Sequence, residues 1–244
     1  MNAGHIKKSE GNTCQNCQTK NCPMINSLPL AIMPELNQAK IQNHYKKGQS
    51  IHLQGTPLYG VSAIESGMVK LVKSMDNGDD IIINLSSKGD IFGLRCLLSN
   101  KTTFATVSVI AVEDTTVCFY DKFFIKEQFR KYPQLALNIL SKLDVYMERD
   151  EVRILSLSKK SVRERVAETL INLEDNYGAQ SLQNSKRVPL QLKRNELSSL
   201  AGTANETFIR TLSEFQKEGL VKLKGSMIEV IDRKALHYCS GAIA

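Results

Sequence analysis

Short apolar segments alternate with glycine turns between residues 47 and 121. The turns recur every 7 to 12 residues, at Lys47-Gly48, Gln54-Gly55, Ser66-Gly67, Asn77-Gly78 and Lys88-Gly89. The segments between them, such as 68–72, 81–85 and 106–110, are rich in β-branched and apolar side chains, which favours strands. Asn-Gly is the strongest short signal for a hairpin turn. The pattern therefore predicts a small antiparallel barrel or jelly roll.

The pattern changes to that of a long helix after Pro133. Apolar side chains recur there at alternating spacings of four and three residues, which is typical of a helix that pairs along a narrow seam. The seam positions are Ala136, Leu140, Leu143, Met147, Asp150, Ile154 and Leu157. In a symmetric parallel dimer two Asp150 carboxylates would face each other and weaken pairing. The alternative is a helix packed on its own barrel, with Asp150 in solvent.

The last third of the chain predicts a winged helix-turn-helix. A break at 158–161 precedes a helix from Val162 to about Asn176 and a polar loop at 178–186. Two short helices then flank a turn at Gly202, with apolar faces made by Leu197, Leu200, Ala201, Phe208, Leu212 and Phe215. Thr203 is the expected N-cap of the second helix and Gly219 its expected end. Residues 220–231 alternate around Gly225, which predicts a hairpin.

The exposed face of the second short helix has the side chains needed to recognise bases. Near its start lie Asn205, Glu206, Ile209 and Arg210, and this end enters the major groove in helix-turn-helix proteins. Arg210 can donate two hydrogen bonds to guanine, Glu206 can accept one from cytosine, and Ile209 can contact a thymine methyl. Phosphate contacts are expected from Lys193, Arg194, Thr203, Lys222 and Lys224. The alternatives are a capping box over Thr203 to Glu206 and a solvated Arg210.

Net charge adds only weak support for a nucleic-acid partner. The 32 Lys and Arg residues exceed the 25 Asp and Glu residues by seven. Before Lys159 the excess is +3 (18 basic, 15 acidic), and from Lys159 onward it is +4 (14 basic, 10 acidic). No run of 18 apolar residues occurs and the start lacks the apolar stretch of a secretory signal. We therefore expect a cytoplasmic protein with no membrane partner.

Three of the six cysteines, Cys14, Cys17 and Cys22, fall in a polar segment without periodicity. In a reducing cytosol such spacing is typical of a metal-binding or redox-active site. A fourth ligand is needed, and the candidates are Cys96, Cys118, Cys239 and His5. Zinc and an iron-sulfur cluster fit this spacing equally well. A thiol oxidoreductase built on Cys14 and Cys17 is a remote alternative, because the strand and helix context is missing and no histidine lies in an acid-base grouping.

The order of these elements resembles the Crp/Fnr superfamily of bacterial transcription regulators over essentially the whole chain. Residues 89–93 (GDIFG) are similar to the glycine motif of its barrel, 157–160 (LSKK) to its link after the dimer helix, and 206–210 (ETFIR) with 215–219 (FQKEG) to its recognition helix. The resemblance implies an α+β fold. We expect residues 1–27 to form a cysteine-rich segment, 28–132 a cyclic-nucleotide-binding-like β-roll, 133–158 a dimerisation helix and 159–244 a winged helix-turn-helix.

The closer resemblance is to the oxygen-sensing branch, typified by the fumarate and nitrate reduction regulator. It implies a [4Fe-4S] cluster on Cys14, Cys17, Cys22 and Cys118, since residues 112–118 (VEDTTVC) match the surroundings of the barrel cysteine. It also implies that the cluster-loaded protein dimerises on a palindromic promoter site, contacts RNA polymerase and is released by oxygen. Cys96 and Cys239 are then ordinary thiols. A regulator of the same fold with zinc or a thiol-disulfide switch is the alternative.

Three features of the chain depart from the patterns of its relatives. The spacing from Cys17 to Cys22 is one residue shorter than is usual in the oxygen-sensing branch, and Ile209 replaces its common serine. The cyclic-nucleotide branch has an acid and an arginine-serine pair in the barrel, where this chain has Leu94 and residues 103–106 (TFAT). A charged phosphate and ribose would lack their partners there, so the sequence disfavours cyclic AMP as the ligand.

Overall fold

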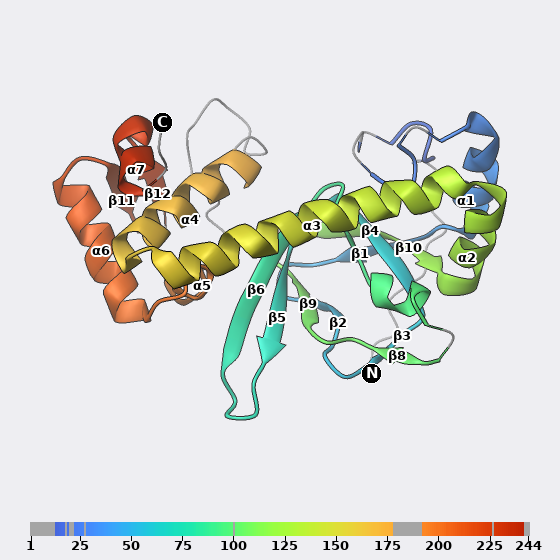
Figure 1. Cartoon of the computed structure of the whole chain (residues 1–244), viewed down its shortest axis with the longest axis horizontal. Helices are drawn as coiled ribbons and strands as arrows, with labels where there is room; N and C mark the ends of the chain where they lie inside the picture. The colour runs from blue at the N-terminus through green and yellow to red at the C-terminus, as the bar shows by residue number, and fades with distance from the viewer. Residues whose placement is uncertain are drawn as a thin grey trace. The chain divides into compact units, whose positions relative to one another are not determined.

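The computed structural model describes residues 13–17, 19, 22–26, 28–99, 101–177, 192–225 and 227–241. The chain divides into two compact units, Met1–Tyr146 and Met147–Ala244, and the long helix α3 (Pro133–Lys159) contributes to both (Figure 1). The predicted helix at 133–158 and the predicted α+β architecture are confirmed. The predicted loop at 178–186 lies outside the described residues.

The first unit is an antiparallel β-roll. One sheet has the order β1-β10-β4-β7, a second has the order β2-β9-β5-β6, and β3 pairs with β8. The strands are β1 (Ile41–Tyr45), β2 (Ser50–His52), β3 (Pro57–Leu58), β4 (Gly60–Ser66), β5 (Met68–Ser74), β6 (Asp80–Ser87), β7 (Ile91–Phe92), β8 (Thr103–Phe104), β9 (Ser108–Ala111) and β10 (Thr115–Asp121). The jelly-roll prediction is therefore confirmed.

Two glycines show why the turns fall where they do. Gly78 has a φ of 86° in the turn that joins β5 to β6, the predicted Asn-Gly hairpin. Gly93 also has a φ of 86°, and a Cβ atom there would lie 2.6 Å from the Gly60 carbonyl oxygen. Only glycine fits both the left-handed backbone and this close approach of strands. The glycine motif at 89–93 is thus required by packing.

Short helices pack on one core of the roll, and the glycine pattern did not predict them. They are η1 (Leu30–Ile32), α1 (Met33–Ala39), η2 (Leu94–Leu97) and α2 (Lys122–Lys131). Asp121 caps α2, because its carboxylate accepts hydrogen bonds from the Phe123 and Phe124 amides at 2.8 and 3.4 Å. The start of α3 packs into the same core, where Leu135 and Ile139 lie among buried side chains of β4, β10 and α1.

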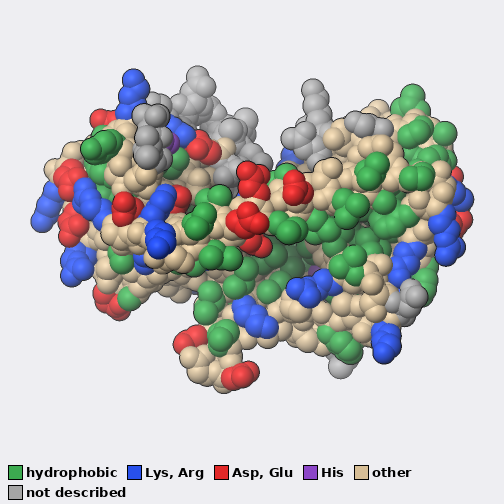
Figure 2. All heavy atoms as spheres, viewed as in Figure 1, with side chains coloured by type: hydrophobic (Ala, Val, Ile, Leu, Met, Phe, Trp, Pro, Cys, Tyr) green, Lys and Arg blue, Asp and Glu red, His purple; other side chains and the backbone are tan. Residues whose placement is uncertain are grey.

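The predicted seam of α3 is largely exposed. Leu140, Met147 and Ile154 keep 57%, 61% and 63% of their surface accessible. Figure 2 shows hydrophobic and acidic side chains side by side along this helix. An exposed apolar row of this length is typical of a helix that pairs with a partner. Asp150 is exposed too, and its charge acts on Arg153 one turn further along.

The second unit contains the predicted winged helix-turn-helix. Its elements are α4 (Val162–Tyr177), α5 (Arg194–Leu200), α6 (Asn205–Lys217), β11 (Val221–Lys224), β12 (Met227–Val230) and α7 (Arg233–Cys239). Phe208, Leu212 and Phe215 are buried on the inner face of α6, as expected. No helix in the described ranges is long and apolar enough to cross a membrane.

One local prediction in this unit is wrong. The N-cap of α6 is Ala204 and not Thr203, because the Ala204 carbonyl accepts the first intrahelical hydrogen bond, from the Phe208 amide at 3.0 Å. No side chain caps this end of the helix. The capping-box alternative for Glu206 therefore fails, and the first amides of α6 are left to bind an external acceptor.

Candidate functional site

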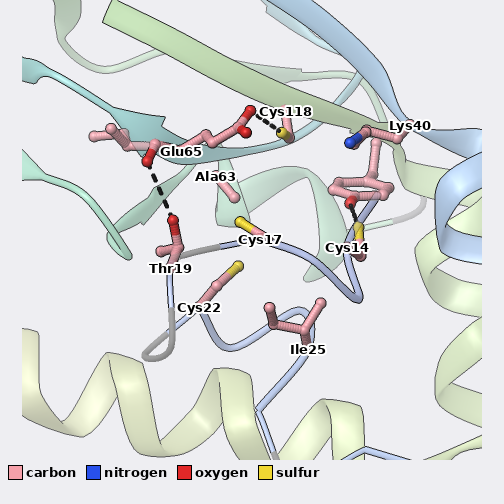
Figure 3. A pocket seen from close by; sticks show the side chains of 11 residues that line it. Cys14, Cys17, Thr19, Cys22, Ile25, Lys40, Ala63, Glu65 and Cys118 are labelled. Carbon is pink, nitrogen blue, oxygen red and sulfur yellow. Dashed lines mark hydrogen bonds between the residues drawn. The ribbon is translucent and has the colours of Figure 1, made fainter. Parts of the chain in front are cut away.

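Four cysteines from two distant segments line one pocket in the first unit (Figure 3). Cys14, Cys17 and Cys22 come from the segment before η1, and Cys118 comes from β10. In the sheet, Cys118 lies between Gln42 of β1 and Ala63 of β4. The other lining residues are Thr19, Ile25, Lys40, Ala63, Ile64, Glu65 and Tyr120. The structure thus brings together the four cysteines that the family resemblance implied.

Hydrogen bonds fix the amino-terminal segment to the roll. The Cys14 amide donates to Asn37 Oδ1 on α1 at 2.7 Å, and the Thr19 hydroxyl donates to the Glu65 carbonyl oxygen on β4 at 3.1 Å. Cys22 is followed by a turn in which its carbonyl oxygen accepts from the Ile25 and Asn26 amides. These contacts hold the cysteines above the sheet that carries Cys118.

The turn after Cys22 also rests on the long helix. The Asn138 side-chain amide of α3 donates to the carbonyl oxygens of both Pro23 and Asn26. Met24 is fully buried and shares a core with Leu135 and Ile139 of α3. The described residues of the cysteine segment therefore pack into the core, and the turn after Cys22 is in direct contact with α3.

Three of the four thiols are buried and hold their protons. Burial raises the pKa of Cys14 and of Cys118, and it raises the pKa of Cys22 to about 12. The charge of Glu65 adds to the rise at Cys118, whereas Lys40 partly offsets it at Cys14 and Cys118. Binding of a metal would have to displace these protons, since only the thiolate is a ligand.

Polar neighbours of the thiols differ from one side of the pocket to the other. The Tyr120 hydroxyl lies 3.3 Å from Cys14 Sγ. On the other side, Cys118 Sγ lies 3.5 Å from Glu65 Oε2, which also accepts a hydrogen bond from the Gln42 side chain. Sequence reasoning did not single out Tyr120, Glu65 or Lys40, because each is distant along the chain from the cysteine segment.

The donor set suits a thiolate-bound metal centre. All six cysteines are free thiols. In the described part of the chain, no three His, Cys, Asp or Glu side chains converge closely enough to hold one ion, so the four thiols surround the pocket rather than meet at a point. Soft sulfur ligands favour iron-sulfur clusters and zinc over hard cations.

The remaining candidates for a fourth ligand do not line this pocket. Cys96 is fully buried in the same core but does not line the pocket, and Cys239 lies in the other unit, where its Sγ accepts from Arg163 at 3.9 Å. His5 is outside the described residues. Of the candidates that the structure describes, only Cys118 stands with the amino-terminal cysteines.

The outer face of α6 presents the predicted base-reading residues. Glu206, Ile209 and Arg210 are exposed, and Ile209 keeps 45% of its surface accessible. Asn205 is half-buried at the start of the helix, and its Oδ1 atom is buried without a hydrogen-bond partner. Three neighbouring side chains are thus free to enter a groove, while Asn205 is turned partly inward.

The predicted phosphate contacts fall into two groups. Lys193, Lys222 and Lys224 are exposed around α5 and the β11–β12 wing, and Thr203 is half-buried in the turn. Arg194 instead donates to the Gly225 carbonyl oxygen at the wing turn at 3.3 Å, and burial lowers its pKa. In the structure Arg194 therefore contacts the wing.

Arg165 of α4 and Leu157 of α3 hold the turn between α5 and α6. Arg165 donates to the carbonyl oxygens of Ala201 and Gly202 at 3.0 and 2.9 Å. A Cβ atom at Gly202, where φ is 62°, would lie 2.4 Å from Leu157 Cδ2. Leu157, a predicted seam residue, thus lies against the turn that precedes α6. Sequence reasoning missed Arg165, which had no motif to mark it.

Comparisons with known families match both units of the chain. A cyclic nucleotide-binding domain model matches residues 42–132, and a Crp-like helix-turn-helix domain model matches residues 164–239. The first match is to a domain family, and the expectation that this chain takes no cyclic nucleotide stays a prediction. The two matched ranges coincide with the β-roll and the winged helix-turn-helix.

Similar proteins are transcription regulators. Electron transport regulator A of Shewanella oneidensis is 30% identical over 197 residues, covering 80% of this chain and 77% of that protein. Transcriptional activator protein anr of Pseudomonas aeruginosa is 29% identical over 220 residues, covering 90% and 88%. The solved structure of FixK2 from Bradyrhizobium japonicum shares the fold, with a TM-score of 0.72, 23% identity and coverage of 84% and 99%.

Proposed function

The chain belongs to the Crp/Fnr superfamily of transcription regulators, and from this premise we propose that it senses oxygen through a [4Fe-4S] cluster. Cys14, Cys17, Cys22 and Cys118 would hold the cluster. The single observation that supports this most is the pocket in which these four thiols stand together. Thiols that surround a space suit a cluster of several irons, whose ligands bind at separate corners.

When bound, the cluster supplies the reactivity toward oxygen, and the chain transmits its state. The turn after Cys22 rests on α3 through Asn138 and the buried Met24. Loss of a ligand at Cys22 would free this turn and change how α3 is held. The exposed seam also lies on α3. The same helix therefore contacts the turn beside the pocket and carries the predicted dimer contact.

The dimer would then bind a palindromic promoter site in the cytoplasm. Two copies of α6 related by a two-fold axis would enter successive major grooves through Glu206, Ile209 and Arg210. Asn205 and Thr203 lie at the edge of that surface, while Lys193, Lys222 and Lys224 would contact phosphates. The seam would be formed by Leu140, Leu143, Met147, Ile154 and Leu157, with Asp150 opposing pairing. We further propose contact with RNA polymerase, on family resemblance alone.

The test is purification without oxygen, followed by iron and sulfide analysis and an absorption spectrum. We expect a brown protein with about four irons and four sulfides per chain, whose colour is lost in air. Cys118→Ser should abolish the colour, and Cys96→Ser, a matched change of a buried cysteine away from the pocket, should retain it. A colourless protein that carries only zinc would overturn the proposal and support the zinc alternative.

A further inference from the structure

Tyr120 lines the pocket and places a neutral hydroxyl within hydrogen-bond distance of a thiol. It follows Cys118 by two positions on β10, so both side chains point to the same face of the sheet. Only 2% of its surface is accessible, and its hydroxyl lies 3.3 Å from Cys14 Sγ. Its ring stacks on Phe124 of α2 at 6.3 Å between centroids. Packing therefore fixes the hydroxyl against the sulfur.

The direction of this hydrogen bond follows from the chemistry of a bound thiolate. A cysteine that ligates iron has lost its proton and can only accept, so the Tyr120 hydroxyl must be the donor. Buried hydroxyls are rarely left unpaired, and Cys14 Sγ is within reach.

We propose that Tyr120 is a positioning residue that orients Cys14 and, by donating to its sulfur, protects the bound cluster against oxidation. The inference rests on the proposed function. A hydrogen bond to a ligand sulfur withdraws electron density and so raises the reduction potential of the metal centre. On the opposite side, the Glu65 carboxylate near Cys118 Sγ places negative charge beside the ligand. The hydrogen bond from Tyr120 acts on the reduction potential in the opposite direction to the negative charge of Glu65.

The experiment compares Tyr120→Phe with Tyr45→Phe in the full chain. Phenylalanine keeps the ring that packs on Phe124 and removes only the hydroxyl. Tyr45 of β1 is a half-buried tyrosine that packs against the other core of the roll, away from the pocket, and is the matched control. Both variants are loaded without oxygen, and thermal unfolding of each confirms that it is folded.

Two measurements are made on the loaded proteins, the midpoint reduction potential and the rate at which cluster absorbance decays in air. We expect Tyr120→Phe to shift the potential downward and to decay roughly threefold to tenfold faster, as loss of one hydrogen bond would give. Tyr45→Phe should match the wild type. Equal potentials and equal decay rates in all three proteins would overturn the inference while leaving the proposed function intact.

A third measurement does not need the cluster. In the cluster-free protein, the Tyr120 hydroxyl lies 3.3 Å from Cys14 Sγ, so removing this hydrogen-bond partner in Tyr120→Phe should change the rate at which Cys14 is alkylated, measured by peptide mass spectrometry. An unchanged alkylation rate would overturn the assigned contact. A wild-type protein that takes up no cluster would overturn the proposed function itself. The iron analysis detects that outcome independently of the potential, decay and alkylation measurements.

Discussion

At the residue scale, Arg210 is the side chain on which we expect base recognition to depend most. It is exposed on the outer face of α6, beside Glu206 and Ile209. Phe208 and Leu212 are buried on the inner face of the same helix. A bidentate contact to guanine discriminates between bases, whereas a phosphate contact does not. The position of Arg210 therefore predicts a loss of specificity when it is removed.

We expect Arg210→Ala to cost about 1 to 3 kcal/mol on the cognate site and little on random DNA. Fluorescence anisotropy on both sequences at fixed salt measures the difference. Lys222→Ala on the wing is the contrasting variant, since loss of a phosphate contact weakens both complexes alike. Equal losses for Arg210→Ala on the two sequences would show that it contacts phosphate.

At the element scale, α3 combines an exposed apolar row with one acid. Asp150→Ala should strengthen dimerisation of the cluster-free protein about tenfold or more, which corresponds to about 1.4 kcal/mol. The reason is that two facing carboxylates in a partly dry seam repel each other. Sedimentation in air measures the effect, and DNA binding in air should rise with it.

Glu148→Ala is the matched control for that change. Glu148 is also an exposed acid on α3, but it lies off the seam positions, so its removal alters the charge of the helix without altering the interface. If both variants strengthen the dimer equally, the effect is one of net charge and the argument from the seam fails. The positive charge of the nearby Arg153, on which Asp150 acts, reduces this repulsion.

Elements with a long periodic pattern could be predicted, and short elements that depend on tertiary contacts could not. The 27 residues of α3 repeat their apolar spacing often enough to be unambiguous. In contrast, α1 has seven residues and begins at Met33-Pro34, so its pattern is too short to stand out. The cap of α6 was misplaced by one residue, because Thr203 has the right chemistry but the helix begins later.

At the scale of the whole molecule, the cysteines of the pocket could be expected from the family resemblance, but their neighbours could not. Tyr120 and Cys14 are separated by 106 positions, and Asn138 and Asn26 by 112. Local periodicity carries no information about which distant side chains meet. The packing of the cysteine segment into the core was missed for the same reason, since its buried residues follow no period.

The buried thiols make the stability of the cluster-free protein depend on pH. The folded protein keeps the Cys22 proton up to about pH 12, whereas the unfolded chain loses it near the ordinary value of 9.0. Above that value the unfolded chain binds fewer protons, so the free energy of unfolding falls as pH rises from 9.0 toward 12. Denaturant midpoints across this range measure the slope, and Cys22→Ser should make it shallower. An identical slope in Cys22→Ser would show that Cys22 does not cause this pH dependence.

The contact between Asn138 and the turn after Cys22 has a consequence for biosynthesis. The amino-terminal cysteines leave the ribosome first, yet the carbonyl oxygens of Pro23 and Asn26 meet their partner only after a further 112 residues beyond Asn26 are made. At 5 to 20 residues per second this takes roughly 6 to 22 seconds. During that time the thiols are open to any oxidant or metal present. The turn after Cys22 can therefore reach its final contacts only late in the synthesis of the first unit.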